Sequence, residues 1–207
     1  MKRICALLLC GALLFPQVAG AADAWPAWAE EALSWGREAS ISQEFLSQPE
    51  QTVTRGMAAQ LLYEAAGKPA VSGECPFTDV SGDNADAVTW AAEQGYLTGV
   101  GDGKYEPGRS VTRQEFAAIR GRRAGSPGAA VQGRDQFRDA GAVGEWARTP
   151  VLWALQAGVM AGQSGGRLAP SGTITAAEAL VMLERAHTLP DVTRLRADLE
   201  ALTAAHR

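Results

Sequence analysis

A complete helix start is encoded by VTRQEF at residues 111–116. Thr112 can cap the helix, and Glu115, three residues later, can reach back to the amide of the cap, an arrangement known as a capping box. Val111 and Phe116 are spaced to pack together as a hydrophobic staple. The same start recurs as ITAAE at 174–178 and, in weaker form, as VTRGM at 53–57. Three copies of one helix start indicate a chain built from repeats.

Other spacings support three repeated units. Trp90 precedes the cap Thr112 by 22 residues, and Trp153 precedes the cap Thr175 by 22 residues. Each unit has one tryptophan-bearing helix and one capped helix, and the first unit also has a polar loop over residues 40–52. One such pair of helices buries too little apolar surface to fold alone.

The sequence therefore predicts a mainly α fold in which three helix-loop-helix repeats pack against one another. Because closure leaves no apolar stripe exposed at an end, we expect a closed, pseudo-threefold, prism-like bundle rather than an open stack. A short C-terminal helix is expected to follow the repeats and to dock on them. The three repeats and this helix are placed at 24–67, 76–120, 136–185 and 190–207.

Residues 1–21 are typical of a secretory signal peptide. Lys2 and Arg3 precede an apolar stretch that ends at Phe15 and is too short to span a bilayer, and small residues precede the expected cleavage after Ala21. Removal of this segment takes away two positive charges and no acid, which lowers the formal net charge from −4 to −6. A negative chain is a poor match for bulk electrostatic attraction to nucleic acid. We expect a secreted protein whose one remaining thiol, Cys75, leaves no intrachain disulfide.

The second unit carries a family pattern. FTDV at 77–80, Trp90, the turn GYLTGVGDG at 95–103, YEP at 105–107 and VTRQEF together resemble one S-layer homology repeat. The resemblance covers about 24–66, 76–120 and 136–184. It implies three tandem repeats, folded as a mostly helical prism, that attach without covalent bonds to a Gram-positive-type cell wall. The implied partner is a secondary cell-wall polysaccharide or peptidoglycan-linked glycan, often bearing pyruvate ketals, and a protein cargo is a further candidate partner.

In the family that this chain resembles, the glycan lies in grooves between neighbouring repeats. Arginine can fork onto a carboxylate, tryptophan can cover a sugar ring, and a helix N-terminus favours an anion. Carried over position by position, the candidate glycan-binding residues are Trp28, Arg55, Asp79, Gly99, Gly101, Asp102, Arg113, Asp139 and Trp146. Asp83 replaces the expected tryptophan in the second unit, and Ala176 replaces the expected arginine in the third. We therefore expect one or two competent grooves, anchored by Arg55 and Arg113.

Each candidate also has a structural explanation. Arg113 could be a solvated charge in the first turn of its helix, and Asp79 or Asp102 could serve a cap or a turn. Trp28 and Trp146 lie near the expected grooves, and both a packing role and a ligand role are open for them. A third set of tryptophans recurs at a position that is expected to face the core. These core tryptophans are Trp35, Trp90 and Trp153.

Enzymatic and metal chemistry find little support in the sequence. The segment that starts at Asp79 invites comparison with a calcium loop, but Asn84 and Trp90 stand where such a loop needs a glycine and a bidentate acid. The two histidines, His187 and His206, lie at the C-terminal end, far from any serine or cysteine with a supporting pattern. We expect no cofactor and no metal.

The sequence thus predicts a secreted, non-catalytic module that anchors to the cell wall surface by binding an anionic, for example pyruvylated, polysaccharide in grooves between repeats. The alternative is a degenerate bundle that acts as a structural or protein-interaction module without glycan binding. Gly56, Asp83 and Ala176, which replace consensus residues, favour this alternative.

Overall fold

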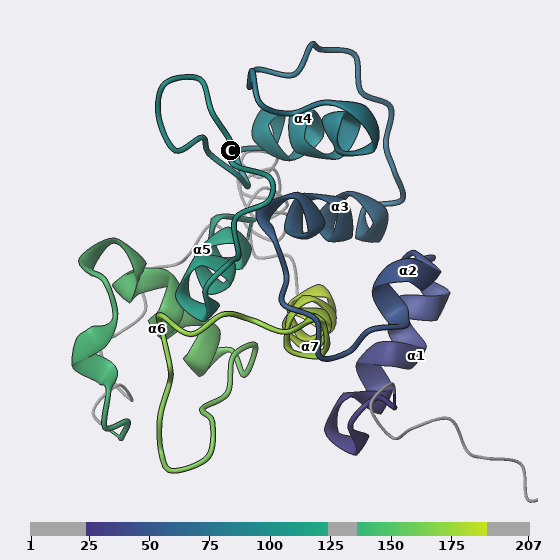
Figure 1. The fold of residues 1–207 in the computed structure, drawn as a ribbon. Coiled ribbons are helices and arrows are strands. Elements are labelled where there is room, and N and C mark those ends of the chain that lie inside the picture. The colour runs from purple at the N-terminus through teal and green to yellow at the C-terminus, as the bar shows by residue number, and fades with distance from the viewer. Residues whose placement is uncertain (1–23, 124–135, 190–207) are drawn as a thin grey trace, which may run out of the picture.

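The computed structural model describes residues 24–123 and 136–189 (Figure 1). Its helices are α1 (Glu30–Glu38), α2 (Gln43–Leu46), α3 (Arg55–Ala65), α4 (Ala85–Glu93), α5 (Arg113–Arg123), α6 (Arg148–Gln156) and α7 (Ala176–Thr188). Short 3-10 turns occupy Ala27–Ala29, Gly82–Asn84, Ala140–Ala142 and Glu145–Ala147. No β-strand occurs within the two described ranges, so the predicted mainly α fold class is confirmed. The predicted signal peptide and C-terminal helix lie outside these ranges.

The capped helices begin where their signals predict. At the start of α5, the Thr112 amide donates to Oε2 of Glu115 (2.8 Å), and the Glu115 amide donates to Oγ1 of Thr112 (3.3 Å). The same reciprocal box starts α7. At the start of α3, Thr54 accepts from the amide of Met57 (3.3 Å), and Met57 has no carboxylate to return a bond. The two full boxes and the weaker one are therefore confirmed.

Two stretches in the first repeat differ from prediction. Residues 40–52, predicted as a loop, contain α2, and its Phe45 and Leu46 are buried, with 6% and 5% of their surface exposed. Polar residues flank this apolar pair, so the sequence pattern did not indicate the single turn of amphipathic helix. The seven-residue spacing of Trp28 and Trp35 predicts one helix that begins at Trp28, but the chain there forms a 3-10 turn and becomes α-helical at Glu30.

Two of the three expected core tryptophans are buried. Trp90 and Trp153 are each 7% exposed. Trp35 is half-buried and packs near the His187 ring, with centroids 5.4 Å apart. Within the described ranges, none of the helices has both the length and the apolar character needed to cross a bilayer.

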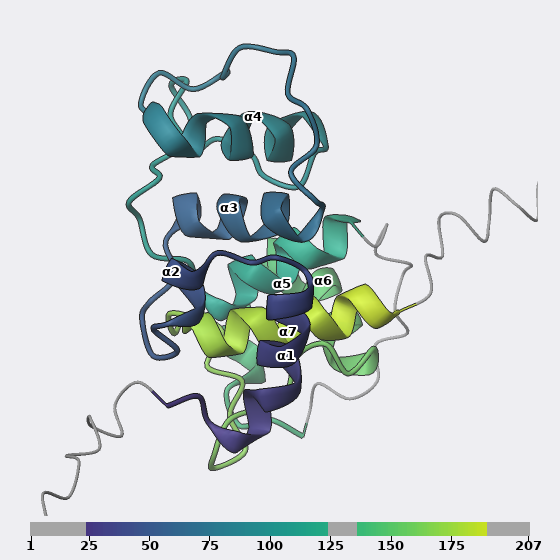
Figure 2. The ribbon, with the colours of Figure 1, turned by 90° about the vertical axis from the view of Figure 1, so that its right-hand side faces the viewer.

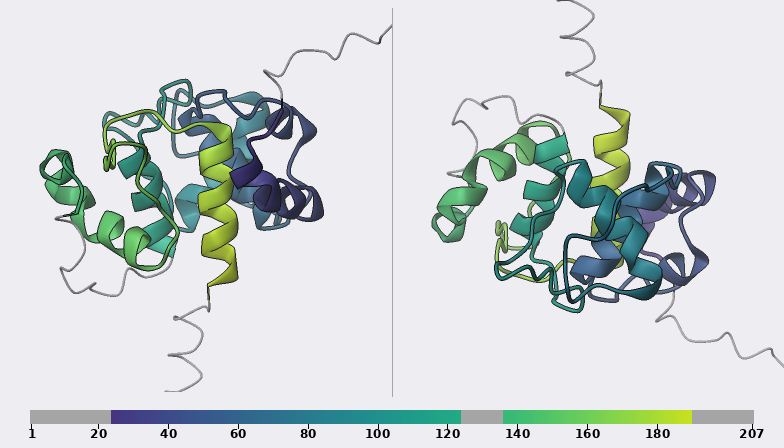
Figure 3. Two further views of the ribbon diagram at one scale, coloured as in Figure 1. Left: turned by 90° about the horizontal axis from the view of Figure 1, so that it is seen from below. Right: turned by 90° about the horizontal axis from the view of Figure 1, so that it is seen from above.

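The helices pack as three pairs that cross the repeat boundaries. α3 of the first repeat packs on α4 of the second, α5 packs on α6 of the third, and α7 of the third packs on α1 of the first. Figure 1 shows the three pairs radiating from the centre, and Figure 2 shows α3 and α4 stacked as one layer on another. In Figure 3, α7 lies between the α5–α6 pair and α1. Each repeat thus gives its capped helix to the tryptophan-bearing helix of the next repeat, and the third repeat returns to the first.

A ring of three backbone hydrogen bonds closes the centre. The Val53 amide donates to the Ile174 carbonyl (3.0 Å), the Ile174 amide to the Val111 carbonyl (3.0 Å), and the Val111 amide to the Val53 carbonyl (2.9 Å). All three residues are 0% exposed. They precede the three cap threonines, so they occupy equivalent positions in the three repeats. An open stack cannot make this cyclic pattern, and the bundle is therefore closed with pseudo-threefold symmetry.

Carbonyls of the following repeat complete the helix N-termini. In α3, the amides of Arg55 and Gly56 donate to the carbonyls of Arg109 and Pro107, at 2.9 and 2.8 Å. The first two amides of α5 and of α7 make the equivalent bonds to carbonyls of Gly172, Pro170, Gln51 and Pro49. The first amides of a helix have no partner within that helix. Closure of the ring therefore satisfies donors that would otherwise need water.

We predict that the Val111→Ala variant is less stable than the wild type by about 2 kcal/mol, because it removes fully buried methyl groups at the ring. The matched control is Val100→Ala at a valine that is 45% exposed, for which we expect a change within about 0.5 kcal/mol. Urea unfolding followed by tryptophan fluorescence measures both. Equal losses in the two variants would contradict a buried, close-packed ring.

Candidate functional site

Arg55 reaches from the first turn of α3 into the second repeat. Its Nε donates to the Tyr105 carbonyl and its Nη2 to the Thr98 carbonyl, both at 2.7 Å. The guanidinium carbon lies 4.4 Å from the centroid of the Tyr105 ring, and the Tyr105 hydroxyl donates to the Arg55 carbonyl (2.8 Å). Only 8% of Arg55 is exposed. Arg55 therefore ties the first repeat to the turn of the second.

Arg113 makes the equivalent tie from α5 into the third repeat. Its Nε donates to the Leu168 carbonyl (3.0 Å) and its Nη2 to the Ala161 carbonyl (2.8 Å). Its Nη1 pairs with Oε1 of Glu178 at 2.6 Å. Arg113 is 4% exposed. Burial lowers the pKa of both arginines, and the Glu178 charge opposes this effect at Arg113.

Two aspartates clamp the backbone that these arginines reach. Asp79 accepts from the amides of Tyr105 and Glu106, both at 2.8 Å. Asp139 accepts from the amides of Leu168 (2.7 Å) and Ala169 (2.9 Å). These amide hydrogen bonds lower the pKa of both carboxyl groups. Tyr105 and Leu168 are each held by an aspartate at the amide and by an arginine at the carbonyl.

The glycine-rich turn of the second repeat has two parts. Gly101 and Asp102 have φ of +119° and +50° and form the tip, where the Lys104 amide donates to the Gly101 carbonyl (2.8 Å). Gly99 lies deeper, and a Cβ there would approach Phe77 to 2.7 Å. Glycine is therefore needed at 99 for a close approach and at 101 for backbone conformation.

Two grooves run along the seams that the arginines cross. The Arg55 groove has a volume of about 200 Å³ and is bordered by Arg55, Gly99, Arg109, Glu115, Arg122 and Trp146. The Arg113 groove has a volume of about 640 Å³ and is bordered by Arg113, Gly162, Glu178, Arg185 and Trp28. Each groove combines an arginine from one repeat, the face of a capped helix from the next, and a tryptophan from the remaining repeat.

The two tryptophans occupy equivalent positions and are open to solvent. Trp28 lies in the 3-10 turn before α1, and Trp146 lies in the 3-10 turn before α6. Their exposed fractions are 57% and 58%. An exposed indole forgoes the hydrophobic stabilisation that a buried one gains. Trp28 and Trp146 therefore differ from the buried Trp90 and Trp153.

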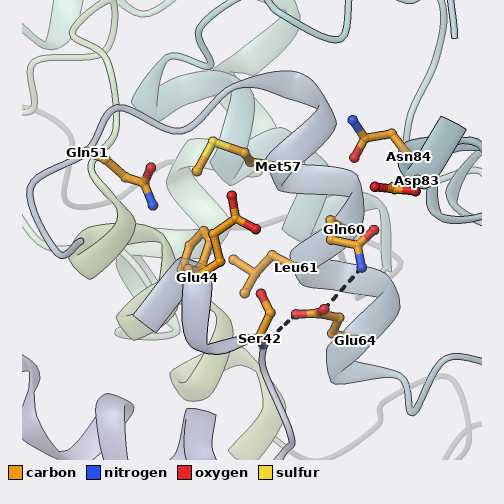
Figure 4. A pocket seen from close by; sticks show the side chains of 10 residues that line it. Ser42, Glu44, Gln51, Met57, Gln60, Leu61, Glu64, Asp83 and Asn84 are labelled. Carbon is orange, nitrogen blue, oxygen red and sulfur yellow. Dashed lines mark hydrogen bonds between the residues drawn. The ribbon is translucent and has the colours of Figure 1, made fainter. Parts of the chain in front are cut away.

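A third groove, the Glu64 groove, occupies the equivalent place on α3 (Figure 4) and has a volume of about 390 Å³. Asp83 stands where the other grooves have tryptophan, and Met57 stands where they have the capping glutamate. Glu64 stands where they have Arg122 or Arg185. Glu64 is buried, accepts from the Ser42 amide (2.8 Å) and the Gln60 side chain (3.1 Å), and pairs with Lys68 (3.3 Å). The repeat pattern thus gives two cationic grooves and one acidic groove.

The structure gathers some of the sequence candidates and separates others. Arg55, Gly99 and Trp146 line one groove, and Arg113 and Trp28 line another. The candidates outside the residues that line these two grooves are Asp79, Gly101, Asp102 and Asp139. Within the described part of the chain, no group of histidine, cysteine, aspartate or glutamate side chains is arranged to hold a metal ion.

Sequence reasoning missed the polar residues along the capped helices. Arg122 follows Glu115 by seven residues on α5, and Arg185 follows Glu178 by seven on α7. Seven residues are two helical turns, so each pair lies on one face. That spacing was a usable signal. Arg109 was not predictable from the repeat, because the equivalent residues are Gln51 and Gly172.

The comparisons with known proteins match two of the three repeats to a known family. The S-layer homology domain family matches residues 76–117 and 136–180, which are the second and third repeats. The chain is 27% identical over 152 residues to cell surface glycoprotein 1 of Acetivibrio thermocellus, covering 67% of this chain and 6% of that protein. It is 28% identical to the cellulosome-anchoring protein of the same organism, covering 68% of this chain and 33% of that protein. It is 31% identical to an amylopullulanase of Thermoanaerobacterium thermosulfurigenes, covering 66% of this chain and 8% of that enzyme.

We predict that Arg113→Ala is destabilised by about 3 kcal/mol or more, because it removes the donor to the buried Leu168 carbonyl and the ion-pair partner of Glu178. Arg122→Ala, at an exposed position on the same helix, is expected to change stability by no more than about 0.5 kcal/mol. Thermal and urea unfolding of both variants measure the difference. A loss in Arg122→Ala as large as that in Arg113→Ala would contradict the assignment of Arg113 as an inter-repeat tie.

We predict that Asp79 and Asp139 make the fold sensitive to acid. Their folded-state pKa lies below the ordinary value of 3.8, so each carboxylate stabilises the fold above that value and loses this contribution as the pH falls through the folded pKa. Asp79→Asn should be less stable at pH 7 and should lose less stability than wild type below about pH 4. Unfolding in urea at a series of pH values measures this, with Asp102→Asn as control. An unchanged pH profile in Asp79→Asn would be inconsistent with the clamp.

Proposed function

With its second and third repeats matched to the S-layer homology domain, we propose that this chain is a secreted, non-catalytic module that binds an anionic secondary polysaccharide of the cell wall. The matched domain, and the names of two relatives as a cell surface glycoprotein and a cellulosome-anchoring protein, support a cell-surface anchoring role. The third relative is an enzyme by name, but the chain covers 8% of its length. A match over so small a part of the enzyme is what we expect for a non-catalytic module that is attached to a separate catalytic domain.

The observation that carries the proposal is the pairing of an exposed tryptophan with arginines in two equivalent grooves. Trp146 borders the Arg55 groove, and Trp28 borders the Arg113 groove. A tryptophan face can cover a sugar ring, and a guanidinium group can fork onto a carboxylate such as that of a pyruvate ketal. The proposed ligand is therefore a sugar that carries an acid group.

The remaining candidates are proposed to shape these grooves. Asp79 and Asp139 clamp the backbone at Tyr105 and Leu168, which is the backbone that the arginines also hold. Gly99 borders the Arg55 groove and allows close packing on Phe77. We assign Gly101 and Asp102 to the conformation of the turn tip, and Arg55 and Arg113 chiefly to holding the seams together.

The second candidate function is a structural or protein-interaction module without glycan binding. Two observations favour it. Arg55 uses two and Arg113 uses three of their five N–H donors on the protein itself. The groove on α3 lacks arginine and tryptophan and carries Glu64 and Asp83 instead.

We predict that the protein sediments with purified wall sacculi and is lost when the secondary polysaccharide has been stripped from them. The double variant Trp28→Ala, Trp146→Ala should bind at least about tenfold more weakly, since stacking on each sugar is removed. Trp28→Phe, Trp146→Phe is the matched control and should retain most binding, because an aromatic face remains. Equal retention of wild type on intact and stripped walls would refute glycan binding and favour the second candidate.

A further inference from the structure

The cations around the two grooves differ in how far the protein already uses them. Arg55 and Arg113 are buried and donate to backbone carbonyls of the neighbouring repeat. Arg109 pairs with Glu115 at 2.7 Å and with Glu106 at 3.2 Å. When a guanidinium group is buried or paired with a carboxylate, the protein already uses part of its charge and some of its N–H donors. Less of both then remains for a ligand. These three arginines are therefore poor direct readers of an incoming acid group.

Arg122 and Arg185 are different. They border the Arg55 groove and the Arg113 groove, and Arg122 is exposed while Arg185 is partly exposed. Each places Nη1 on a backbone carbonyl of its own repeat, Arg122 on that of Tyr96 (3.0 Å) and Arg185 on that of Gly158 (3.4 Å). A carbonyl orients the guanidinium fork without neutralising its charge. Among the ion pairs of the described residues, none involves either of these two arginines.

The same position on α3 reverses the charge. Glu64 follows its cap threonine by ten residues, as Arg122 and Arg185 follow theirs. The Glu64 groove also carries Glu44 and Asp83 on its border and no arginine. Carboxylates on the border of a groove repel an anionic ligand and disfavour its binding. The position that carries an arginine in the two cationic grooves thus carries a buried glutamate, paired with Lys68, in the third groove, whose border has the exposed acids Glu44 and Asp83.

We propose that Arg122 and Arg185 are the residues that read the acid group of the ligand, and that the chain binds two acidic sugars, one in each cationic groove. This proposal rests on the proposed function. The sugar ring lies against Trp146 or Trp28, and its carboxylate lies on the arginine from the last turns of the capped helix. The third groove lacks this arginine and has the exposed acids Glu44 and Asp83 on its border, so it does not take an acidic sugar. The first-turn arginines hold the seam and do not set the preference for acid.

The test uses a pyruvate-ketal hexose glycoside in two forms, the free acid and its neutral methyl ester, titrated into the full chain by calorimetry. Wild type should bind two equivalents of the acid, about tenfold more tightly than the ester, as expected for a charge-assisted hydrogen bond at an exposed site. The variant Arg122→Gln, Arg185→Gln should bind acid and ester alike, at the affinity that wild type has for the ester. Lysine at both positions should restore part of the preference, because the charge returns without the fork.

The matched control is Arg37→Gln, Arg138→Gln, which makes the same change in net charge at exposed arginines outside both grooves and should leave the preference for acid intact. Undiminished preference for acid in Arg122→Gln, Arg185→Gln would overturn the proposal. So would binding of wild type to wall polysaccharide without any preference for acid over ester, an outcome in which the proposed function survives. Failure of wild type to bind both the probes and the wall polysaccharide would overturn the proposed function as well.

Discussion

The structure depends on a closed cycle of backbone hydrogen bonds between three equivalent residues, Val53, Val111 and Ile174. Each residue donates to one neighbour and accepts from the other, and each is fully buried. Removing one repeat would leave an unpaired donor and an unpaired acceptor in an apolar centre, where each costs about 1–3 kcal/mol. The three repeats are therefore interdependent, although each resembles the others as a local unit.

The grooves are a consequence of this closure. Because each capped helix packs on the next repeat, every seam joins residues that are far apart in sequence. Arg55 meets Gly99 and Trp146 only because all three repeats come together. The buried arginines that cross the seams hold the groove walls in place, and the exposed tryptophans lie at their edges. Stability and recognition are thus divided between different residues of one motif.

Much of the fold could be predicted from local signals. The capping boxes at Thr112 and Thr175 gave the helix starts, and the equal spacing of Trp90 and Trp153 from them gave the repeat. The exchange of helices between repeats could not be predicted, because it depends on which apolar faces fit together. The Arg55 side chain donates to backbone carbonyls, and a backbone carbonyl has no signature in the sequence. The burial of Arg55 could therefore not be predicted. The charge reversal at Glu64 was visible in the alignment of the repeats and has meaning only once α3 is seen to line a groove.

The most direct test of the account is a titration of the protein with released wall polysaccharide, followed by NMR of the six tryptophan indole N–H groups. The indole signals of Trp28 and Trp146, assigned with single phenylalanine variants, are predicted to shift on binding, because these two side chains border the cationic grooves. The signals of the buried Trp90 and Trp153 should stay in place. The absence of any shift at Trp28 and Trp146, or shifts confined to the buried pair, would contradict glycan binding in the seams between the repeats.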